Sequence, residues 1–406
     1  MALLVQKYGG SSVADADKVK SVAARIGKSK EAGNQVVVVV SAMGDTTDDL
    51  VTLAYQINDK PAMRELDVLL STGEVVSSTL LAMALHKLGH PAISLSGAQA
   101  GIKTDAGYTS ALITDIDPKR VHKELDKGNI VIVAGFQGIT EDMDITTLGR
   151  GGSDTTAVAL AAALKAERCE RYTDVDGIYT ADPRLLPEAR KLKDISYDEM
   201  LEMVTYGFKS IHPRAVELGE LYDIHIQVAS SFNDNPGTLI HNEVSMENRN
   251  KVRGIAHDLD VAKITVVGVP DQPGVAAAIF VPLAEAGISV DTIVQNASQA
   301  KITDLTFTVA RSQLEAAMKV IDPVAESIKA REVLTDSGLG KVSIIGSGMQ
   351  NTPGYAARMF DTLSKAGVNI EMISTSEIRI TCIIEEARVK DAVRALHRAF
   401  ELEKAD

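Results

Sequence analysis

The sequence is poor in aromatic residues and in cysteine. Only 4% of its 406 residues are aromatic, none is tryptophan, and the two cysteines, Cys169 and Cys382, are far apart with no Cys-x-x-Cys spacing. Scarce aromatics argue against a stacking platform for single-stranded nucleic acid. Two isolated cysteines are typical of a reducing compartment, and we expect both to be small buried residues rather than ligands.

Positive charge is also in short supply. The chain has 42 Lys and Arg against 55 Asp and Glu, a formal net charge of −13. Because affinity for a nucleic-acid backbone comes from clustered cations, we expect no nucleic-acid partner. The first residues, MALLVQKYGG, lack the charged and apolar regions of a secretory signal, and no apolar run approaches the ~18 residues that span a bilayer. We therefore expect a cytoplasmic protein with no membrane partner.

β-Branched residues, by contrast, gather in short runs. Residues 2–8, 35–43, 91–97 and 129–136 are apolar runs bounded by Gly or Pro, and helical patterns such as 16–33 and 74–89 alternate with them. This alternation predicts an α/β fold with a mostly parallel sheet covered on both faces. Ligands of such sheets bind beyond the carboxyl ends of the strands, so the residues that follow each strand are the candidates for function.

The second half of the chain repeats itself. A polar stretch at 241–251 is predicted to be a linker, and beyond it the segments that begin at Lys263 and Lys341 are similar. Gly268 aligns with Gly346, an offset of 346−268 = 78. Each copy has the pattern strand, Pro-Gly turn, helix, strand, which indicates a duplicated βαβ-type module. A duplication that only dimerises the protein is the alternative.

The first two strand ends carry candidate anion-binding residues. In KYGGSS, Gly9 and Gly10 let the backbone approach a ligand, a helix N-terminus favours an anion, and Lys7 adds a positive charge. Alone, this motif would also fit an ordinary βα turn with a surface lysine. In SAMGDTTDDL, Ser41 and Thr47 offer hydroxyl groups, although helix capping alone would explain that stretch.

Two further motifs place charges at the starts of helices. In STGE, Glu74 is predicted at the opening of a long helix, where an acid either offsets the helix dipole or binds a ligand ammonium. In TTLGRGGSDTTA, Arg150 stands between glycines, and arginine suits recognition of a carboxylate or phosphate. A structural turn needs no such charge. Ser153 or Asp154 is the predicted N-cap of the buried helix at 157–166.

The stretch YTDVDGIYTADPR is predicted to follow another strand. Asp174 is beside a tight turn, Tyr179 supplies an aromatic face, and Arg184 supplies a cation. The stretch YGFKSIHPRA adds Lys209. His212 has no base or nucleophile partner in the sequence, so we expect it to be structural.

Taken in order, these motifs resemble those of the aspartate kinases, within the amino acid kinase family, and the two repeats look like ACT amino-acid-sensing domains. The resemblance covers essentially the whole chain. It implies a three-layer αβα catalytic domain over 1–245, a linker over 246–262, and two ferredoxin-like (βαββαβ) ACT domains over 263–335 and 336–406. The departures are mild: Tyr8, Ser11 and Ser210 stand where Phe, Thr and a small apolar residue are usual.

The resemblance implies a role for each motif. Lys7 would stabilise the transferred phosphate, and Asp154 would orient Lys7. Glu74 would bind the ammonium of the amino-acid substrate and Arg150 its α-carboxylate, with Ser41 and Thr47 beside them. The ATP site would be lined by residues of several motifs: Gly9, Gly10, Ser11, Thr173, Asp174, Tyr179, Arg184 and Lys209.

The implied reaction transfers the γ-phosphoryl group of ATP to the β-carboxylate of L-aspartate, the first step towards lysine, threonine and methionine. A carboxylate with a pKa near ~4 is already an anion at neutral pH. The reaction therefore needs alignment and charge neutralisation but no general base. No carboxylate cluster is visible in the sequence, so we expect Mg²⁺ to be held by phosphates and water, with no protein metal ligand.

The paired ACT modules imply regulation by an end product. Lysine and/or threonine would bind at a module interface and favour an inactive arrangement. The residues implied are Asp271, Gly274, Ala276, Gln295 and Asn296 of the first copy and Asn369 and Ile370 of the second. The resemblance also implies a homo-oligomer through the ACT domains. Met246 is a candidate internal start for a separately made regulatory half.

Two other interpretations stay open. One is another amino acid kinase, acting on acetylglutamate, glutamate or carbamate, although the pairing of STGE with GRGGSDTT and the tandem repeats favour aspartate. The other is a non-catalytic amino-acid sensor, in which Lys7 would have no role in turnover.

Overall fold

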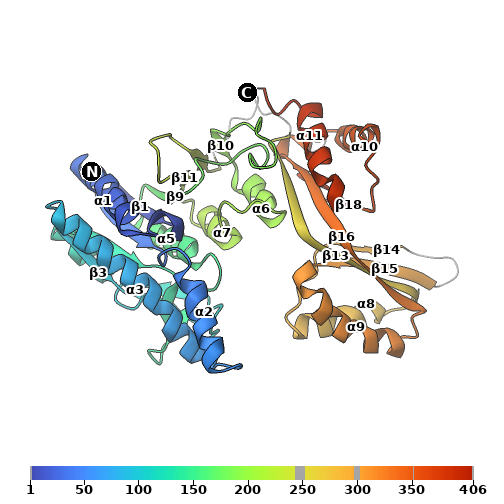
Figure 1. The fold of residues 1–406 in the computed structure, drawn as a ribbon, viewed down its shortest axis with the longest axis horizontal. Coiled ribbons are helices and arrows are strands. Elements are labelled where there is room, and N and C mark those ends of the chain that lie inside the picture. Colours follow the sequence, from blue (N-terminus) through green and yellow to red (C-terminus); the bar gives the residue numbers. More distant parts are fainter. Residues whose placement is uncertain (1, 243–251, 297–301, 351, 405–406) are drawn as a thin grey trace. The chain divides into compact units, whose positions relative to one another are not determined.

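The computed structural model describes residues 2–242, 252–296, 302–350 and 352–404, so Met246 lies outside the described residues. The chain forms two compact units (Figure 1). The N-terminal unit consists of Met1–Tyr179, Lys191–Thr205 and Lys209–Asn248. The C-terminal unit consists of Thr180–Arg190, Tyr206–Phe208 and Arg249–Asp406.

An eight-stranded sheet forms the centre of the N-terminal unit. Its strand order is β10-β12-β11-β9-β1-β2-β6-β3, and all neighbours are parallel except β11 and β12. The strands are β1 (Leu3–Tyr8), β2 (Gln35–Val40), β3 (Ala92–Leu95), β6 (Ile130–Ala134), β9 (Arg168–Thr173), β10 (Asp194–Ile195), β11 (Ile226–Ser230) and β12 (Thr238–Ile240). The four runs predicted to be strands are β1, β2, β3 and β6, so the mostly parallel sheet is confirmed.

Helices cover both faces of this sheet. α1 (Ala16–Glu31) and α3 (Met63–Lys87) pack together on one face, where their apolar residues join Tyr8 and alternate residues of β2 and β6 in one core cluster (Figure 1). α5 (Gly152–Leu164) contacts Lys7, which points to the opposite face because successive strand residues alternate. α6 (Tyr197–Thr205) and α7 (Pro213–Leu221) pack beside α5. The predicted three-layer αβα arrangement is confirmed.

α3 begins earlier than predicted. It starts at Met63 rather than at Glu74, which is 74−63 = 11 residues sooner, so Glu74 lies in the middle of the helix and cannot offset its dipole. Gly73 lies inside the helix and packs against Ala42, where a Cβ atom would approach the Ala42 Cβ to 2.8 Å, so the glycine serves close packing rather than ending the helix. By length and composition α3 could cross a membrane, but half of its most apolar stretch is buried inside the unit, as in a core helix.

A second, four-stranded sheet has the order β5-β4-β7-β8. Its strands are β4 (Ile102–Thr104), β5 (Ile113–Ile116), β7 (Gln137–Ile139) and β8 (Ile145–Thr147). β7 and β8 form an antiparallel hairpin just before the glycine-rich motif. The predicted N-cap of the next helix is wrong: Gly151 caps α5, while Ser153 and Asp154 lie in its first turn. The Asp154 side chain is directed to Lys7 and Arg171 instead.

The C-terminal unit contains one six-stranded sheet, in the order β14-β15-β13-β16-β18-β17. Its strands are β13 (Gly254–Pro270), β14 (Ile293–Gln295), β15 (Ile302–Val309), β16 (Glu332–Ile345), β17 (Met372–Thr375) and β18 (Arg379–Glu385). Its helices are α8 (Val275–Glu285), α9 (Leu314–Ser327), α10 (Tyr355–Lys365) and α11 (Val389–Ala399). The two repeats have the same element order, so the duplication is confirmed.

Part of the expected linker over 246–262 is a strand of the sheet, which corrects that prediction for 254–262. Residues 254–262 form the first half of β13, and Gly254–Asp258 pair with Ile345–Lys341 of the second repeat. The start of β16, Glu332–Asp336, pairs in turn with Val267–Lys263 of the first repeat. The first module is thus closed by the strand that follows α9. The second module ends on α11, and its sheet takes the last strand from Gly254–Asp258, which precede the first repeat.

Two short segments from the first half of the chain belong to the C-terminal unit, so the units do not divide at a single point near residue 245. In Thr180–Arg190, Ala181 and Leu186 lie in the core cluster of the second module, and the hydroxyl of Thr180 is 2.9 Å from Nε2 of buried His397. In Tyr206–Phe208, the Tyr206 ring stacks 3.8 Å from the Arg379 guanidinium.

Candidate active site

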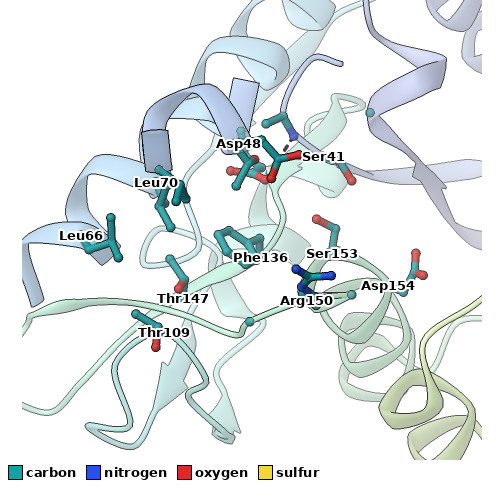
Figure 2. Close-up of a pocket in the computed structure, with 18 of the residues that line it drawn as sticks. Ser41, Asp48, Leu66, Leu70, Thr109, Phe136, Thr147, Arg150, Ser153 and Asp154 are labelled. Carbon is teal, nitrogen blue, oxygen red and sulfur yellow. Dashed lines mark hydrogen bonds between the residues drawn. The ribbon is translucent and has the colours of Figure 1, made fainter. Parts of the chain in front are cut away.

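A cavity of about 660 Å³ lies where β1 and β2 end. It is enclosed by α2 (Thr46–Ile57), by α3, by the start of α5 and by the glycine loop, defined here as residues 146–152 (Figure 2). A cavity of this size suits a small-molecule ligand. The residues predicted from the sequence that line it are Lys7, Gly10, Ser41, Thr47, Glu74, Arg150 and Asp154. Motifs far apart in the chain thus meet at the carboxyl edge of the sheet.

Gly10 brings the turn after β1 close to the turn after β2. A Cβ atom at Gly10 would lie 2.9 Å from the carbonyl oxygen of Ala42, so a side chain there would push the two turns apart. The neighbouring Gly9 N–H donates to the Tyr172 carbonyl at 3.3 Å, and Ser11 is exposed. The glycine pair therefore serves close approach of backbone to backbone at the cavity edge.

Three charged side chains form a buried cluster beside the cavity. The Lys7 ammonium lies 2.6 Å from Asp154 Oδ1, and Arg171 Nε donates to Asp154 Oδ2 at 3.0 Å. Burial lowers the pKa of Lys7, and Asp154 offsets part of that effect. Burial alone would raise the pKa of Asp154, but Arg171 and Lys7 hold it well below its usual value. Asp154 is therefore an anion at neutral pH and holds both cations.

Glu74 approaches the same cavity from α3. Its Oε1 accepts a hydrogen bond from the Ala42 N–H at 3.1 Å, whereas its buried Oε2 has no hydrogen-bond partner among the residues that the structure describes. Burial raises the pKa of Glu74 to about 7, and the Ala42 N–H and Lys7 act in the opposite direction. A buried carboxylate oxygen without a donor is unfavourable, so the site suits a ligand cation.

Arg150 extends from the glycine loop into the cavity (Figure 2). On either side of it, Gly149 and Gly151 have φ values of 75° and 70°, in the left-handed region that favours glycine. A Cβ atom at Gly151 would also lie 2.4 Å from the Cβ of His212. His212 itself caps α7 by accepting from the Arg214 N–H at 3.3 Å, which is a structural role.

Sequence reasoning missed three residues that shape the cavity. Arg171 joins the charged cluster, and Phe136, in a left-handed conformation with φ 70°, faces the cavity (Figure 2). Buried Asp67 accepts from the Thr147 N–H and hydroxyl at 2.9 and 2.6 Å, which anchors the glycine loop to α3. Asp67 lies two helical turns before Glu74, a spacing that could have been recognised. The places of Arg171 and Phe136 depend on long-range packing.

The other residues predicted for an ATP site lie around the end of β9 and in both units. Thr173 is the last residue of β9, and its hydroxyl donates to the Asp174 carboxylate at 2.9 Å. Tyr179 lies at the end of the next turn. Arg184 belongs to the C-terminal unit, and Lys209 is an exposed residue of the N-terminal unit.

The predicted effector residues lie at turns and edges of the C-terminal unit. Gly274, with φ 95°, caps α8, with Asp271 just before it and Ala276 in the first turn. Gln295 ends β14, and Asn296 follows it. In the second repeat, Ile370 follows Asn369, and the Asn369 side-chain amide donates to Glu371 at 3.0 Å. Glu371 in turn pairs with Lys263 of the first repeat at 3.1 Å.

The sequence matches known families over most of its length. Residues 2–230 match the amino acid kinase family, and residues 263–326 and 342–400 match ACT domains. The chain is 51% identical over 408 residues to an aspartokinase of Mycolicibacterium smegmatis, covering 99% of this chain and 97% of that one. It is 50% identical over 402 residues to an aspartokinase of Geobacillus stearothermophilus, covering 99% and 98%.

Solved structures share the fold of the whole chain. E. coli aspartokinase III in complex with aspartate and ADP, in the R-state, has a TM-score of 0.79 at 26% identity, covering 98% of this chain and 99% of that one. The same enzyme in complex with lysine and aspartate, in the T-state, has a TM-score of 0.77 at 26% identity, with the same coverage of 98% and 99%.

Proposed function

Because this chain belongs to the aspartokinases of the amino acid kinase family, we propose that it transfers the γ-phosphoryl group of ATP to the β-carboxylate of L-aspartate. The product would be 4-phospho-L-aspartate, at the head of a route to lysine, threonine and methionine. The ADP and aspartate bound by E. coli aspartokinase III support this pair of substrates.

The observation that carries the proposal is the arrangement of opposite charges around one cavity. Glu74 presents a carboxylate oxygen that has no donor in the described part of the chain, and Arg150 presents a guanidinium from the glycine loop. These two groups complement the ammonium and α-carboxylate of a free amino acid. Lys7 lies on the sheet side of the same cavity, where the side-chain carboxylate would meet the phosphoryl group.

The chemistry follows from these charges. The acceptor carboxylate is already ionised at neutral pH, so no group has to remove a proton. The barrier comes from bringing an anion to a polyphosphate, and the Lys7 ammonium lowers it by neutralising charge as the phosphoryl group moves. Asp154 fixes the Lys7 ammonium at 2.6 Å, so the cation is in position before substrates arrive. Ser41 and Thr47 supply hydroxyl donors to the same cavity.

The nucleotide would extend from this cavity towards the end of β9. We assign its binding to the backbone at Gly9, Gly10 and Ser11 and to the side chains of Thr173, Asp174, Tyr179 and Lys209, all in the N-terminal unit. In the described ranges no group of three or more His, Cys, Asp or Glu is placed to hold a metal ion. We assign Mg²⁺ to the phosphates and water, where it would supply neutralising charge.

We assign regulation to the C-terminal unit, with lysine and/or threonine as effectors. The lysine bound by E. coli aspartokinase III in its T-state supports lysine, and threonine rests on the resemblance. The effector would contact the turn before α8 and the end of β14 in the first repeat, and Asn369 and Ile370 in the second. Exposed apolar strand residues, among them Ile293, Leu334 and Ile373, support association of copies through this unit.

Substrate profiling tests the proposal. We expect aspartate-dependent release of ADP, with a product that hydroxylamine traps as the β-hydroxamate, and inhibition when lysine and threonine are titrated separately and together. Turnover of N-acetylglutamate or glutamate but not of aspartate would establish another amino acid kinase. Binding of lysine or threonine without turnover of any carboxylate would establish a sensor.

A further inference from the structure

Arg171 is a second cation placed in register with Lys7. β1 and β9 are parallel neighbours, and their pairing sets Lys7 directly beside Arg171. Side chains at paired positions of neighbouring strands point to the same face, and like charges there repel. The two cations are held together because Asp154 stands between them, with one carboxylate oxygen on each. The pairing is a property of the fold, since 164 residues separate the two positions in the chain.

The cluster carries more positive than negative charge. Lys7 and Arg171 contribute two cations, and Asp154 contributes one anion. Burial raises the pKa of the neighbouring Cys169 thiol and lowers the pKa of His212, so both are neutral at pH 7. The net charge of this three-residue cluster is therefore positive, in a place where Lys7 and Asp154 are almost fully buried. An excess buried cation is costly unless an anion arrives to pair with it.

The guanidinium of Arg171 has a buried nitrogen that makes no hydrogen bond within the described part of the protein. Its Nε donates to Asp154, whereas its Nη1 is buried and has no hydrogen-bond partner in the described part of the protein. Arg171 also lines the cavity that contains Lys7 and Gly10. A buried donor without an acceptor is costly, and more so when the group is charged. A ligand oxygen that accepts a hydrogen bond from Arg171 Nη1 would remove this cost.

We propose that Arg171 is a second phosphoryl-binding residue, whose Nη1 donates to an oxygen of the transferred phosphoryl group while Nε stays on Asp154. This inference rests on the proposed function, because that function brings a γ-phosphoryl group to Lys7. In this arrangement the two cations have different roles towards the phosphoryl group. Lys7 meets the moving group as a point charge, and the planar guanidinium of Arg171 fixes its orientation.

Binding and turnover of Arg171→Met test the proposal. We expect kcat to fall about 100-fold, with the KM for aspartate within threefold of the parent enzyme. Affinity for a β,γ-imido analogue of ATP should fall at least tenfold, while affinity for ADP, which has no γ-phosphoryl group, should change less than twofold. Arg168→Met is the matched control, since Arg168 lies on the same strand and pairs with Glu170 instead of Asp154; it should leave all these values unchanged.

The pH profile reports on the positive charge that Arg171 places beside Lys7. The groups that act on Lys7 are Asp154, Arg171 and Cys169, and Glu74 faces it from α3. Arg171 lowers the pKa of Lys7, so in Arg171→Met the alkaline limb of kcat should move to higher pH. Arg171→Lys, which keeps a cation for Asp154 but loses Nη1, should recover at least tenfold of the lost kcat and return that limb towards its original pH.

The outcomes separate this inference from the proposed function. Equal losses of affinity for ADP and the imido analogue, or no loss for either, would overturn the role of Arg171 even in an enzyme that phosphorylates aspartate. If Arg171→Met does not fold, Arg171→Lys answers the same question by the same two affinities. Absence of aspartate turnover in the parent enzyme would overturn the proposed function, and the affinity difference would still judge Arg171.

Discussion

In the N-terminal unit one cluster of buried charged side chains borders a cavity, whereas in the C-terminal unit a comparable cluster is paired within the protein. Lys341 of β16 pairs with Asp291, the Tyr206 hydroxyl donates to Asp291 at 3.4 Å, and the Tyr206 ring packs against Arg379. Each of these charged groups has a protein partner. At the cavity, by contrast, Glu74 and Arg171 each keep a buried polar atom without a partner in the described ranges. The paired charges of the C-terminal unit stabilise the fold, whereas those at the cavity have polar atoms left to bind a ligand.

Replacing Lys7 should give the largest effect, a loss of activity at the cavity without a loss of stability. We expect Lys7→Met to lower kcat by about 1,000-fold, because charge on the moving phosphoryl group loses its nearest cation. The melting temperature should hold or rise, since Asp154 keeps Arg171 as a partner. Steady-state kinetics and thermal unfolding measure both, with the exposed Lys20→Met as control. A kcat within tenfold of the parent would refute the role of Lys7.

Arg150 should affect binding of the acceptor more than chemistry. We expect Arg150→Met to raise the KM for aspartate about 100-fold, because the α-carboxylate loses a charged partner worth about 2–3 kcal/mol. The KM for ATP and the melting temperature should change little. Arg120→Met, on the exposed surface of α4 (Lys119–Asp126), is the control. An equal rise in both KM values would mean that Arg150 does not distinguish the two substrates.

Asp291 tests the other side of the comparison. We expect Asp291→Ala to destabilise the protein by about 2 kcal/mol, because Lys341 stays buried without its anion. The effect is below that of a fully buried pair since the Asp291 side chain is 32% exposed. Chemical unfolding measures the loss, and kcat without effector should stay within twofold. Asp361→Ala, which removes a surface pair with Lys365 on α10, should cost less than 0.5 kcal/mol by the same method.

Glu74 should give the smallest effect, and one that depends on pH. Its pKa is raised to about 7 by burial, so the carboxylate is lost by protonation as the pH falls below that value. The KM for aspartate should therefore rise about tenfold from pH 8 to pH 6 in the parent enzyme. In Glu74→Gln it should be high and nearly constant over that range. A KM profile that is the same in both proteins would exclude Glu74 as the group that binds the ammonium.

Much of this arrangement could be predicted from sequence, because it depends on local patterns. The β-branched runs indicated the sheet, and the position of each motif after a strand placed Lys7, Ser41 and Arg150 at one edge of it. The start of α3 was wrong because a glycine was taken as a boundary, whereas Gly73 lies inside the helix for close packing on Ala42.

The residues that were missed depend on contacts that no local pattern encodes. Arg171 is at the cavity because β9 pairs in register with β1, which is set by the packing of the whole sheet. The strand at Gly254–Asp258 is of the same kind, since 254–262 looks like a linker until its partner strand in the second repeat is known. Sequence thus indicated which motifs matter, and tertiary pairing decided which residues join them.

The membership of Thr180–Arg190 and Tyr206–Phe208 in the C-terminal unit has a consequence for dissecting the protein. A fragment that begins at Met246 would lack Ala181 and Leu186 from its core cluster and Tyr206 from its place against Arg379. Such a fragment would have to refill that space, by repacking or by covering it with another chain. Swapping regulatory halves between relatives therefore calls for transplanting three pieces of chain, of which two lie inside the catalytic sequence.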